Sequence, residues 1–149
     1  DKYLTFMSST LTGEPVSTTI FYEYDMTVVN FWASYCLEDG INELDTLQAF
    51  YKDLQKKHPN VNFIQVVIDT PAETAEDLVL DAYDEHGVTF TGIMPDENLA
   101  KWIMANLEGL PTTIFVDSEG MPRDFRIEGI QDKAYYMETT ESMLEAIGK

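Results

Sequence analysis

Cys36 is the residue in this sequence that is best suited to chemistry. An apolar run, residues 28–32, leads through Tyr35 to this cysteine, and the acidic residues Glu38 and Asp39 follow it. This order predicts a buried strand and then the first turn of a long helix, where unpaired backbone N–H groups and the helix dipole favour a thiolate. The carboxylates of Glu38 and Asp39 oppose that effect, because like charge raises the pKa of a thiol. With no cation close in sequence, we expect the pKa of Cys36 in the upper half of the range of about 3.5 to 7.5 for activated thiols.

The sequence holds 149 residues and one cysteine. An internal disulfide is therefore excluded, and cysteine usage does not indicate a redox compartment. A single thiol could attack a disulfide, a peroxide or a sulfenic acid, but an external thiol must then resolve the adduct. The alternative is an unreactive cysteine on a scaffold that has lost its activity.

Metal and cofactor chemistry find little support in the sequence. His58 and His86 each stand beside a predicted helix end, where a C-terminal cap explains them better than a metal site. The acidic stretch 69–85 lacks the glycine and the spacing of a calcium loop. The glycine-rich and serine motifs of nucleotide-binding proteins and hydrolases are absent, and Ala33 stands where a peroxiredoxin carries Thr or Ser. We therefore expect no metal and no cofactor.

The charge balance of the chain excludes two classes of partner. The length is that of one domain, 1–149, and nine basic residues against 27 acidic ones give a net charge of −18. Such a surface repels phosphates and anionic lipids, so nucleic acid is not an expected partner. No apolar run reaches the length of a membrane span, and no signal peptide is recognisable. Because the chain opens at Asp1 without a methionine, we expect a processed form from which an N-terminal export signal or membrane anchor has been removed.

Short β-prone runs alternate with segments of helical periodicity, which predicts an α/β fold with a mixed central sheet and helices on both faces. An N-terminal hairpin opens the chain, because a Gly-Pro turn separates its first two β-prone runs. Asn30 interrupts the central strand and needs an internal partner there. The expected strands are 3–7, 16–21, 28–32, 61–68, 88–93, 114–116 and 125–130, and the expected helices run from Cys36 to residue 57 and over 74–86, 97–106 and 133–147.

Several segments together resemble the thioredoxin superfamily, and within it the TlpA/ResA-like branch of extracytoplasmic thiol–disulfide oxidoreductases. VVNFWASYC at 28–36 is similar to the strand and aromatic run that lead to the first active-site cysteine of that branch. GLPTTIFVD at 109–117 resembles its cis-proline segment and the strand that follows, and LTGEPV at 11–16 resembles its N-terminal β-hairpin. The helix and strand expected between 69 and 94 stand where the branch carries an insertion. The resemblance covers nearly the whole chain and implies a thioredoxin-like fold.

The sequence departs from this family at its central motif. The family carries C-x-x-C, whereas here Cys36 is followed by Leu-Glu-Asp, so the second, resolving cysteine is missing. Asp39 takes its place in an ungapped alignment, and Gly40 does so if one residue is inserted. Under the second alignment Glu43 matches a family carboxylate near the active site; otherwise it is a glutamate on the helix surface.

The resemblance also implies how the remaining site residues act. Pro111 would be the cis-proline that faces the thiol, and the backbone of Leu110 would pair with an extended substrate as an added β-strand. Trp32 and Tyr35 flank the thiol and either stack over a bound peptide or belong to the core. Asn30 stands where thioredoxins hold a buried acid; it cannot relay a proton but can form internal hydrogen bonds.

The sequence therefore predicts an extracytoplasmic thiol–disulfide redox protein with a degenerate, monothiol site at Cys36. Its partner would be a thiol- or disulfide-bearing protein or an extended peptide. A non-catalytic peptide-binding module on the same scaffold and a one-cysteine peroxidase are the alternatives.

Overall fold

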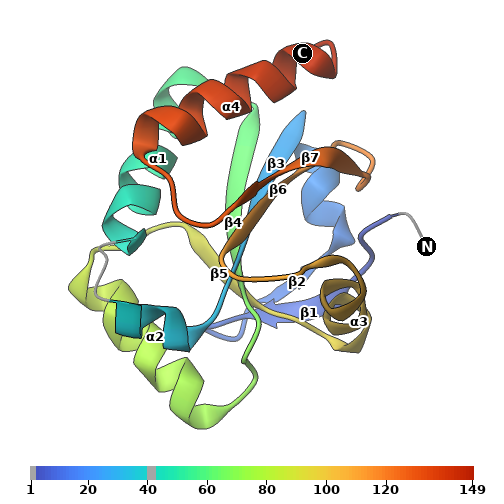
Figure 1. Cartoon of the computed structure of the whole chain (residues 1–149). Helices are drawn as coiled ribbons and strands as arrows, with labels where there is room; N and C mark the ends of the chain where they lie inside the picture. Colours follow the sequence, from blue (N-terminus) through green and yellow to red (C-terminus); the bar gives the residue numbers. More distant parts are fainter. Residues whose placement is uncertain (1–2, 40–42) are drawn as a thin grey trace.

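A seven-stranded mixed sheet forms the centre of the computed structural model, which describes residues 3–39 and 43–149 (Figure 1). The strands lie in the order β2-β1-β5-β4-β3-β6-β7. The neighbours β3, β4 and β5 are parallel, whereas β6 is antiparallel to β3 and β1 is antiparallel to β5. The strand bounds are β1 Met7–Thr10, β2 Pro15–Ser17, β3 Met26–Trp32, β4 Val61–Val67, β5 Thr91–Met94, β6 Thr112–Asp117 and β7 Pro122–Glu128.

Helices cover both faces of this sheet. The helices α1, α2 and α4 lie on one face and α3 lies on the other (Figure 1). Their buried side chains form two separate apolar clusters, and the short 3₁₀ helix η1 contributes to the one on the side of α3. The predicted α/β class, the N-terminal hairpin β1–β2 and the insertion formed by α2 and β5 are all present. The bounds are η1 Thr18–Glu23, η2 Ser34–Asp39, α1 Glu43–Lys57, α2 Glu73–Glu85, α3 Glu97–Asn106 and α4 Lys133–Ala146.

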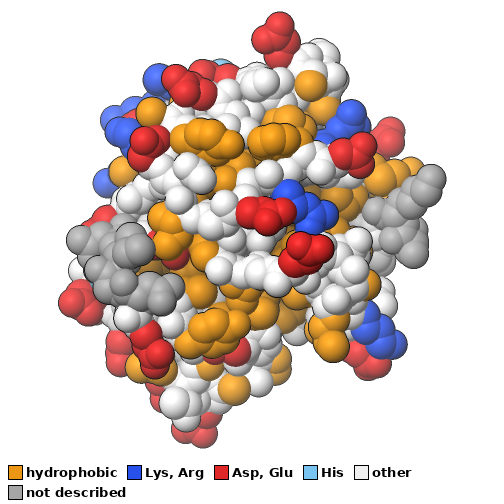
Figure 2. All heavy atoms as spheres, in the orientation of Figure 1, with side chains coloured by type: hydrophobic (Ala, Val, Ile, Leu, Met, Phe, Trp, Pro, Cys, Tyr) orange, Lys and Arg blue, Asp and Glu red, His pale blue; other side chains and the backbone are white. Residues whose placement is uncertain are grey.

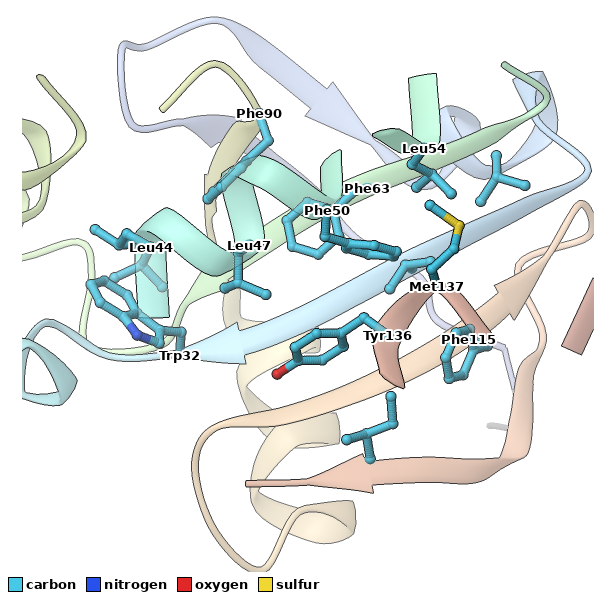
Figure 3. Close-up of a cluster of buried hydrophobic side chains, with 14 of the residues drawn as sticks. Trp32, Leu44, Leu47, Phe50, Leu54, Phe63, Phe90, Phe115, Tyr136 and Met137 are labelled. Carbon is cyan, nitrogen blue, oxygen red and sulfur yellow. The ribbon is translucent and has the colours of Figure 1, made fainter. Parts of the chain in front are cut away.

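The central strand β3 is buried along its whole length, as its apolar sequence predicts. On the face toward α1 and α4, aromatic rings fill the space between helices and sheet (Figure 3). Phe50 of α1 lies 5.6 Å from Tyr136 of α4 and 5.8 Å from Phe63 of β4, measured between ring centroids. These large side chains fix how the two helices sit on the strand that leads to Cys36.

A row of buried polar side chains, which we call the polar ladder, crosses this face of the sheet. Thr113, Asn30 and Gln65 are direct neighbours on β6, β3 and β4. Asn30 donates to Thr113 Oγ1 at 3.0 Å and accepts from Gln65 Nε2 at 2.9 Å, and Tyr83 of α2 donates its hydroxyl to Gln65 Oε1. Burial raises the pKa of Tyr83. The internal partner that the sequence required for Asn30 is thus present.

Gly92 makes room for the end of this ladder. It lies opposite Gln65 in the register of β4 and β5. A Cβ atom at this position would lie 2.6 Å from Oη of Tyr83 and 2.5 Å from Cδ1 of Leu11. A larger residue would therefore push the tyrosine away from its partner.

Acidic residues cap two of the helices. Asp96 begins α3, where its Oδ1 accepts the N–H of Leu99 at 2.8 Å and its Oδ2 accepts the N–H of Met7 at 2.9 Å. Asp132 begins α4, where its Oδ1 accepts the N–H of Tyr135 at 2.8 Å; within the described residues, its carboxylate has no bond to the N-terminal strand like that of Asp96. Both follow the usual preference for N-caps, but Asp96 also holds the first strand in place.

The two histidines lie at helix ends, as predicted. His58 follows α1, and its Nε2 lies 2.8 Å from the carboxylate of Glu141 on α4. His86 ends α2, and its Nδ1 lies 2.9 Å from the carboxylate of Asp45 on α1. Each therefore links two helices of the same layer.

Several predicted strands have wrong bounds, two of them near the N-terminus. The second run, expected as a strand over 16–21, is a strand only to Ser17, which caps η1 by accepting the N–H of Thr19. The 3₁₀ turn directs Phe21 into the core, which explains the apolar residue that suggested a strand. The first strand begins at Met7 instead of residue 3, and β5 begins at Thr91 instead of residue 88.

The surface is acidic, and its two arginines lie on one edge. Acidic side chains are spread over the visible face in Figure 2. Arg123 and Arg126, the only arginines in the sequence, both belong to the edge strand β7. Arg123 pairs with Asp117 at 3.3 Å, and Arg126 donates to the backbone carbonyl of Asn106 at 2.6 Å. None of the helices in the described ranges is long and apolar enough to cross a membrane.

Candidate thiol site

Antiparallel pairing of β3 with β6 brings the two predicted motifs to one edge of the sheet. Phe31 near the end of β3 lies opposite Thr112 at the start of β6. Cys36 follows β3 in the turn η2, and Pro111 directly precedes β6. The Leu110–Pro111 peptide bond is cis, the isomer that the motif predicts.

Cys36 lies in a 3₁₀ turn and not at the start of the long helix. The helix α1 begins at Glu43, so the predicted start directly after Cys36 is wrong. The N–H of Cys36 donates to the carbonyl of Ala33 at 2.9 Å, which uses this donor within the turn. The side chain is 6% exposed and belongs to the same apolar cluster as Trp32. The backbone N–H of Cys36 is therefore not one of the unpaired helix-start amides that the sequence predicted.

A carboxylate already occupies the amino end of η2. Asp69, two residues after the end of β4, accepts the backbone N–H of Ser34 at 3.0 Å and the Ser34 hydroxyl at 2.5 Å. Tyr35 is 56% exposed beside this contact. Its pKa is raised by partial burial first, and then by the charges of Cys36 and Asp69, so the phenol has both groups nearby. In the sequence, Asp69 directly follows the strand expected over 61–68, but no hydrogen-bond partner for it could be predicted.

Glu43 is buried, which corrects the expectation of a glutamate on the helix surface. It is 4% exposed, and its Oε2 accepts the indole N–H of Trp32 at 3.2 Å. Trp32 itself is 1% exposed and lies in the core (Figure 3), so its ring offers no surface for a bound peptide. Burial raises the pKa of Tyr136 to about 12, a hydrogen bond from Gln131 opposes this, and the Glu43 carboxylate adds to it.

Leu110 presents its backbone beside the thiol turn. Its side chain packs against both apolar clusters, and the next carbonyl, that of Pro111, accepts the N–H of Gly129 at 2.9 Å. Within residues 3–39 and 43–149, no hydrogen bond reaches the N–H or the carbonyl of Leu110. Both groups are thus open to pair with an extended chain.

Two predicted positions lie at the limit of what is described. Gly40 falls outside the described residues, and of Asp39 only its place at the end of η2 is described. Both alignments, with Asp39 or with Gly40 in the place of the missing cysteine, therefore stay open. Among the residues that are described, no group of three His, Cys, Asp or Glu side chains could hold a metal ion.

The chemistry that this arrangement allows is that of one thiol beside carboxylates. Asp69 lies at the amino end of the turn and Glu43 is buried under Trp32. Negative charge near a thiol disfavours its ionised, nucleophilic form. The described residues thus place the thiol turn and the cis-proline segment at the same end of neighbouring strands.

Many solved structures have the same architecture, although comparisons of the sequence alone find no match. No protein-family model and no curated protein matches the sequence. The structure is similar to a thiol:disulfide interchange protein of the thioredoxin family from Chlorobium tepidum, with a TM-score of 0.75 and 19% identity over 96% of this chain and 95% of that one. It is similar to StoA from Bacillus subtilis, with a TM-score of 0.69 and 21% identity over 92% and 96%. It is also similar to a secreted disulfide oxidoreductase of Mycobacterium tuberculosis homologous to E. coli DsbE, with a TM-score of 0.69 and 16% identity over 92% and 95%. The chain therefore has the thioredoxin-like fold that its motifs predict.

Proposed function

We propose that this chain is an extracytoplasmic thiol–disulfide redox protein of the TlpA/ResA type that works through the single thiol of Cys36. One observation carries the proposal: the thiol turn and the cis-proline segment meet at one edge of the sheet, where the backbone of Leu110 is open. A thiol with a strand-like docking surface beside it suits a substrate that binds in extended form. The names of the similar structures, which are thiol:disulfide interchange proteins, agree with this chemistry.

The reaction needs two thiols, of which the chain supplies one. The Cys36 thiolate attacks one sulfur of a partner's disulfide, forms a new S–S bond to it and releases the other partner sulfur as a thiolate, which takes up a proton. A thiol from a second molecule then attacks the mixed disulfide and returns Cys36 to the reduced state. The partner's disulfide is thereby exchanged, and turnover depends on the external thiol.

A peptide-binding module without catalysis is the second candidate. It is favoured by the low exposure of Cys36, 6%, and by the carboxylates around the thiol turn. Binding along Leu110 requires only the backbone and survives the loss of a resolving cysteine.

An extracytoplasmic location follows from the family resemblance and agrees with the description of the M. tuberculosis structure as secreted. We include it in the proposal. Expression of the natural gene with a reporter fused to its C-terminus, followed by separation of cell fractions, tests it; a cytoplasmic reporter would contradict it.

The activity is tested with a peptide disulfide. A cysteine-containing peptide carrying a thionitrobenzoate leaving group is mixed with the protein, and the release of the coloured anion is followed beside the same reaction of free cysteine and of Cys36→Ser. The second reagent is a small disulfide with the same thionitrobenzoate leaving group but no peptide. When the two rates are compared at the same pH, we expect Cys36 to react faster with the peptide than with this small disulfide. If both reagents react at the same rate, and Cys36→Ser binds the reduced peptide as tightly as the parent protein does, the redox function is contradicted. The binding module is then the candidate that stays. Rapid oxidation by hydrogen peroxide without peptide capture would instead indicate the peroxidase.

A further inference from the structure

We propose that Asp69 is a positioning residue for Cys36, which holds the turn η2 in place and sets a fixed negative charge beside the thiol. The inference rests on the proposed function only in taking Cys36 as the reacting atom. It assigns control over how fast this thiol reacts to a residue just beyond the end of β4.

Two hydrogen bonds tie the turn to Asp69. Its two carboxylate oxygens accept the backbone N–H and the hydroxyl of Ser34, which is 8% exposed and two residues before Cys36. Hydrogen bonds to an ionised acceptor are stronger than neutral ones, and two of them fix both position and orientation. Because the first residue of a six-residue turn is held in this way, the place of Cys36 is held with it.

The backbone on both sides of Asp69 is itself held. The N–H of Ile68 donates to the carbonyl of Trp32 at 2.8 Å, which extends the pairing of β3 with β4 up to the turn. On the other side, both the N–H and the hydroxyl of Thr70 donate to the carbonyl of Val67, at 3.2 and 2.6 Å. The carboxylate of Asp69 is thus attached to a backbone segment that hydrogen bonds hold on both sides.

The charge of Asp69 acts close to the thiol. Both groups are near enough to the Tyr35 phenol to disfavour its ionisation. The charge is not the only one at this edge, so its contribution has to be separated from that of its neighbours. The other titratable residues on the elements around η2 include Glu38 and Asp39 on η2, Glu43 and Asp45 at the start of α1, Glu73 and Glu76 at the start of α2, Tyr83 within it and His86 at its end, Glu108 before Leu110, and Tyr136 on α4.

Three substitutions separate the charge of Asp69 from its hydrogen bonds. Asp69→Asn keeps the size and one acceptor oxygen but removes the charge. Ser34→Ala keeps the charge and removes the hydroxyl bond. Glu38→Gln removes an exposed charge of the same turn, which forms no hydrogen bond or ion pair with the other described side chains, and is the matched control.

The measurement is the rate of Cys36 alkylation by iodoacetamide as a function of pH, which yields a midpoint and a limiting rate at high pH. For Asp69→Asn we expect the midpoint to fall, so that alkylation at pH values well below the parent's midpoint becomes about three- to tenfold faster, since removal of a nearby like charge favours the thiolate. For Ser34→Ala we expect an unchanged midpoint but a higher limiting rate, because a looser turn exposes the sulfur. Glu38→Gln should leave the limiting rate unchanged and move the midpoint less than Asp69→Asn does.

The inference is overturned if Asp69→Asn leaves the midpoint unchanged or raises it, or if Glu38→Gln shifts it as much. Unfolding curves of each variant verify that the fold is intact, and if Asp69→Asn does not fold, Ser34→Ala decides through the limiting rate alone. Iodoacetamide needs no docking surface, so these results stand apart from peptide capture. The protein could fail to capture the peptide disulfide and still show the expected alkylation profiles. That result would contradict the proposed function and would support the role of Asp69.

Discussion

Replacement of Thr113 and Thr27 by valine, one at a time, subjects two buried hydroxyl groups in neighbouring strands to the same change. Thr113 of β6 is 0% exposed and accepts a hydrogen bond from Asn30 in the polar ladder. Thr27 of β3 is also 0% exposed, but its Oγ1 has no hydrogen-bond partner among the described residues. Valine has nearly the same shape as threonine, so packing is preserved and only the hydroxyl group is removed.

The expected effects have opposite sign. A buried hydroxyl without a partner costs about 1–3 kcal/mol of folding free energy, so Thr27→Val should stabilise the protein by about 1 kcal/mol or more. Thr113→Val leaves an amide hydrogen of Asn30 unpaired at the same kind of cost, partly offset by the added methyl group, and should destabilise by about 1–2 kcal/mol. For a chain of this size, each kcal/mol moves the melting temperature by about 2–4 °C.

Urea unfolding followed by circular dichroism measures both variants against the parent protein under identical conditions. An unchanged dependence of the unfolding free energy on urea would show that the variants differ in stability and not in the extent of unfolding. The reasoning is refuted if Thr27→Val destabilises the protein, or if Thr113→Val is neutral, because the hydrogen-bond assignments would then not describe the folded state.

Three further predictions concern a close contact, a buried phenol and the helix caps. Gly92→Ala should destabilise by about 2–4 kcal/mol in thermal unfolding, since the new Cβ clashes with two side chains, whereas Gly109→Ala, with nothing within 4 Å of its Cβ, should change stability by less than about 0.5 kcal/mol. The raised pKa of Tyr136, about 12, means that its contribution to stability is complete below about pH 10, the usual tyrosine value, and is lost as pH rises toward 12. Urea unfolding at pH 7 and 11 should therefore show a smaller difference between the parent and Tyr136→Phe at the higher pH, and an equal difference would contradict it. Asp96→Ala should destabilise by about 1–3 kcal/mol and Asp132→Ala by about 1 kcal/mol, since the first also loses a bond to the N-terminal strand; equal losses in urea unfolding would show that this bond is not formed.

The fold was predictable because its strongest signals are local. The apolar run before Cys36 gave a buried central strand, and the periodicity after it gave α1, whose end at Lys57 before His58 is confirmed. The 3₁₀ helix η1 was missed because one buried aromatic residue, Phe21, produces the same sequence signal as a strand. Short turns are decided by caps and packing, which a pattern of apolar residues does not contain.

The site was predictable in its outline and not in its contacts. The motifs correctly gave the cis bond before Pro111 and its edge of the sheet. The burial of Glu43 depends on how α1 packs against Trp32, and the bond from Ser34 to Asp69 joins residues 35 positions apart that the pairing of β3 with β4 brings together. A weak signal for Asp69 existed, because a polar residue at the carboxyl end of β4 must lie beside the end of β3 if the two strands are parallel neighbours.

The polar ladder also tells correct strand pairing from incorrect pairing during folding. If β3 slipped by two residues along β4, the Asn30 amide would face Phe63 or Val67, and a slip along β6 would place it opposite Phe115 or Pro111. The apolar residues around it would still pack after such a slip, since their neighbours are apolar too. Each slip would remove the hydrogen-bond partner of Asn30 on that strand, and a buried amide group left unpaired costs about 1–3 kcal/mol. The ladder therefore favours the register in which β3, the strand that leads to Cys36, pairs with β4 and β6 in the folded structure.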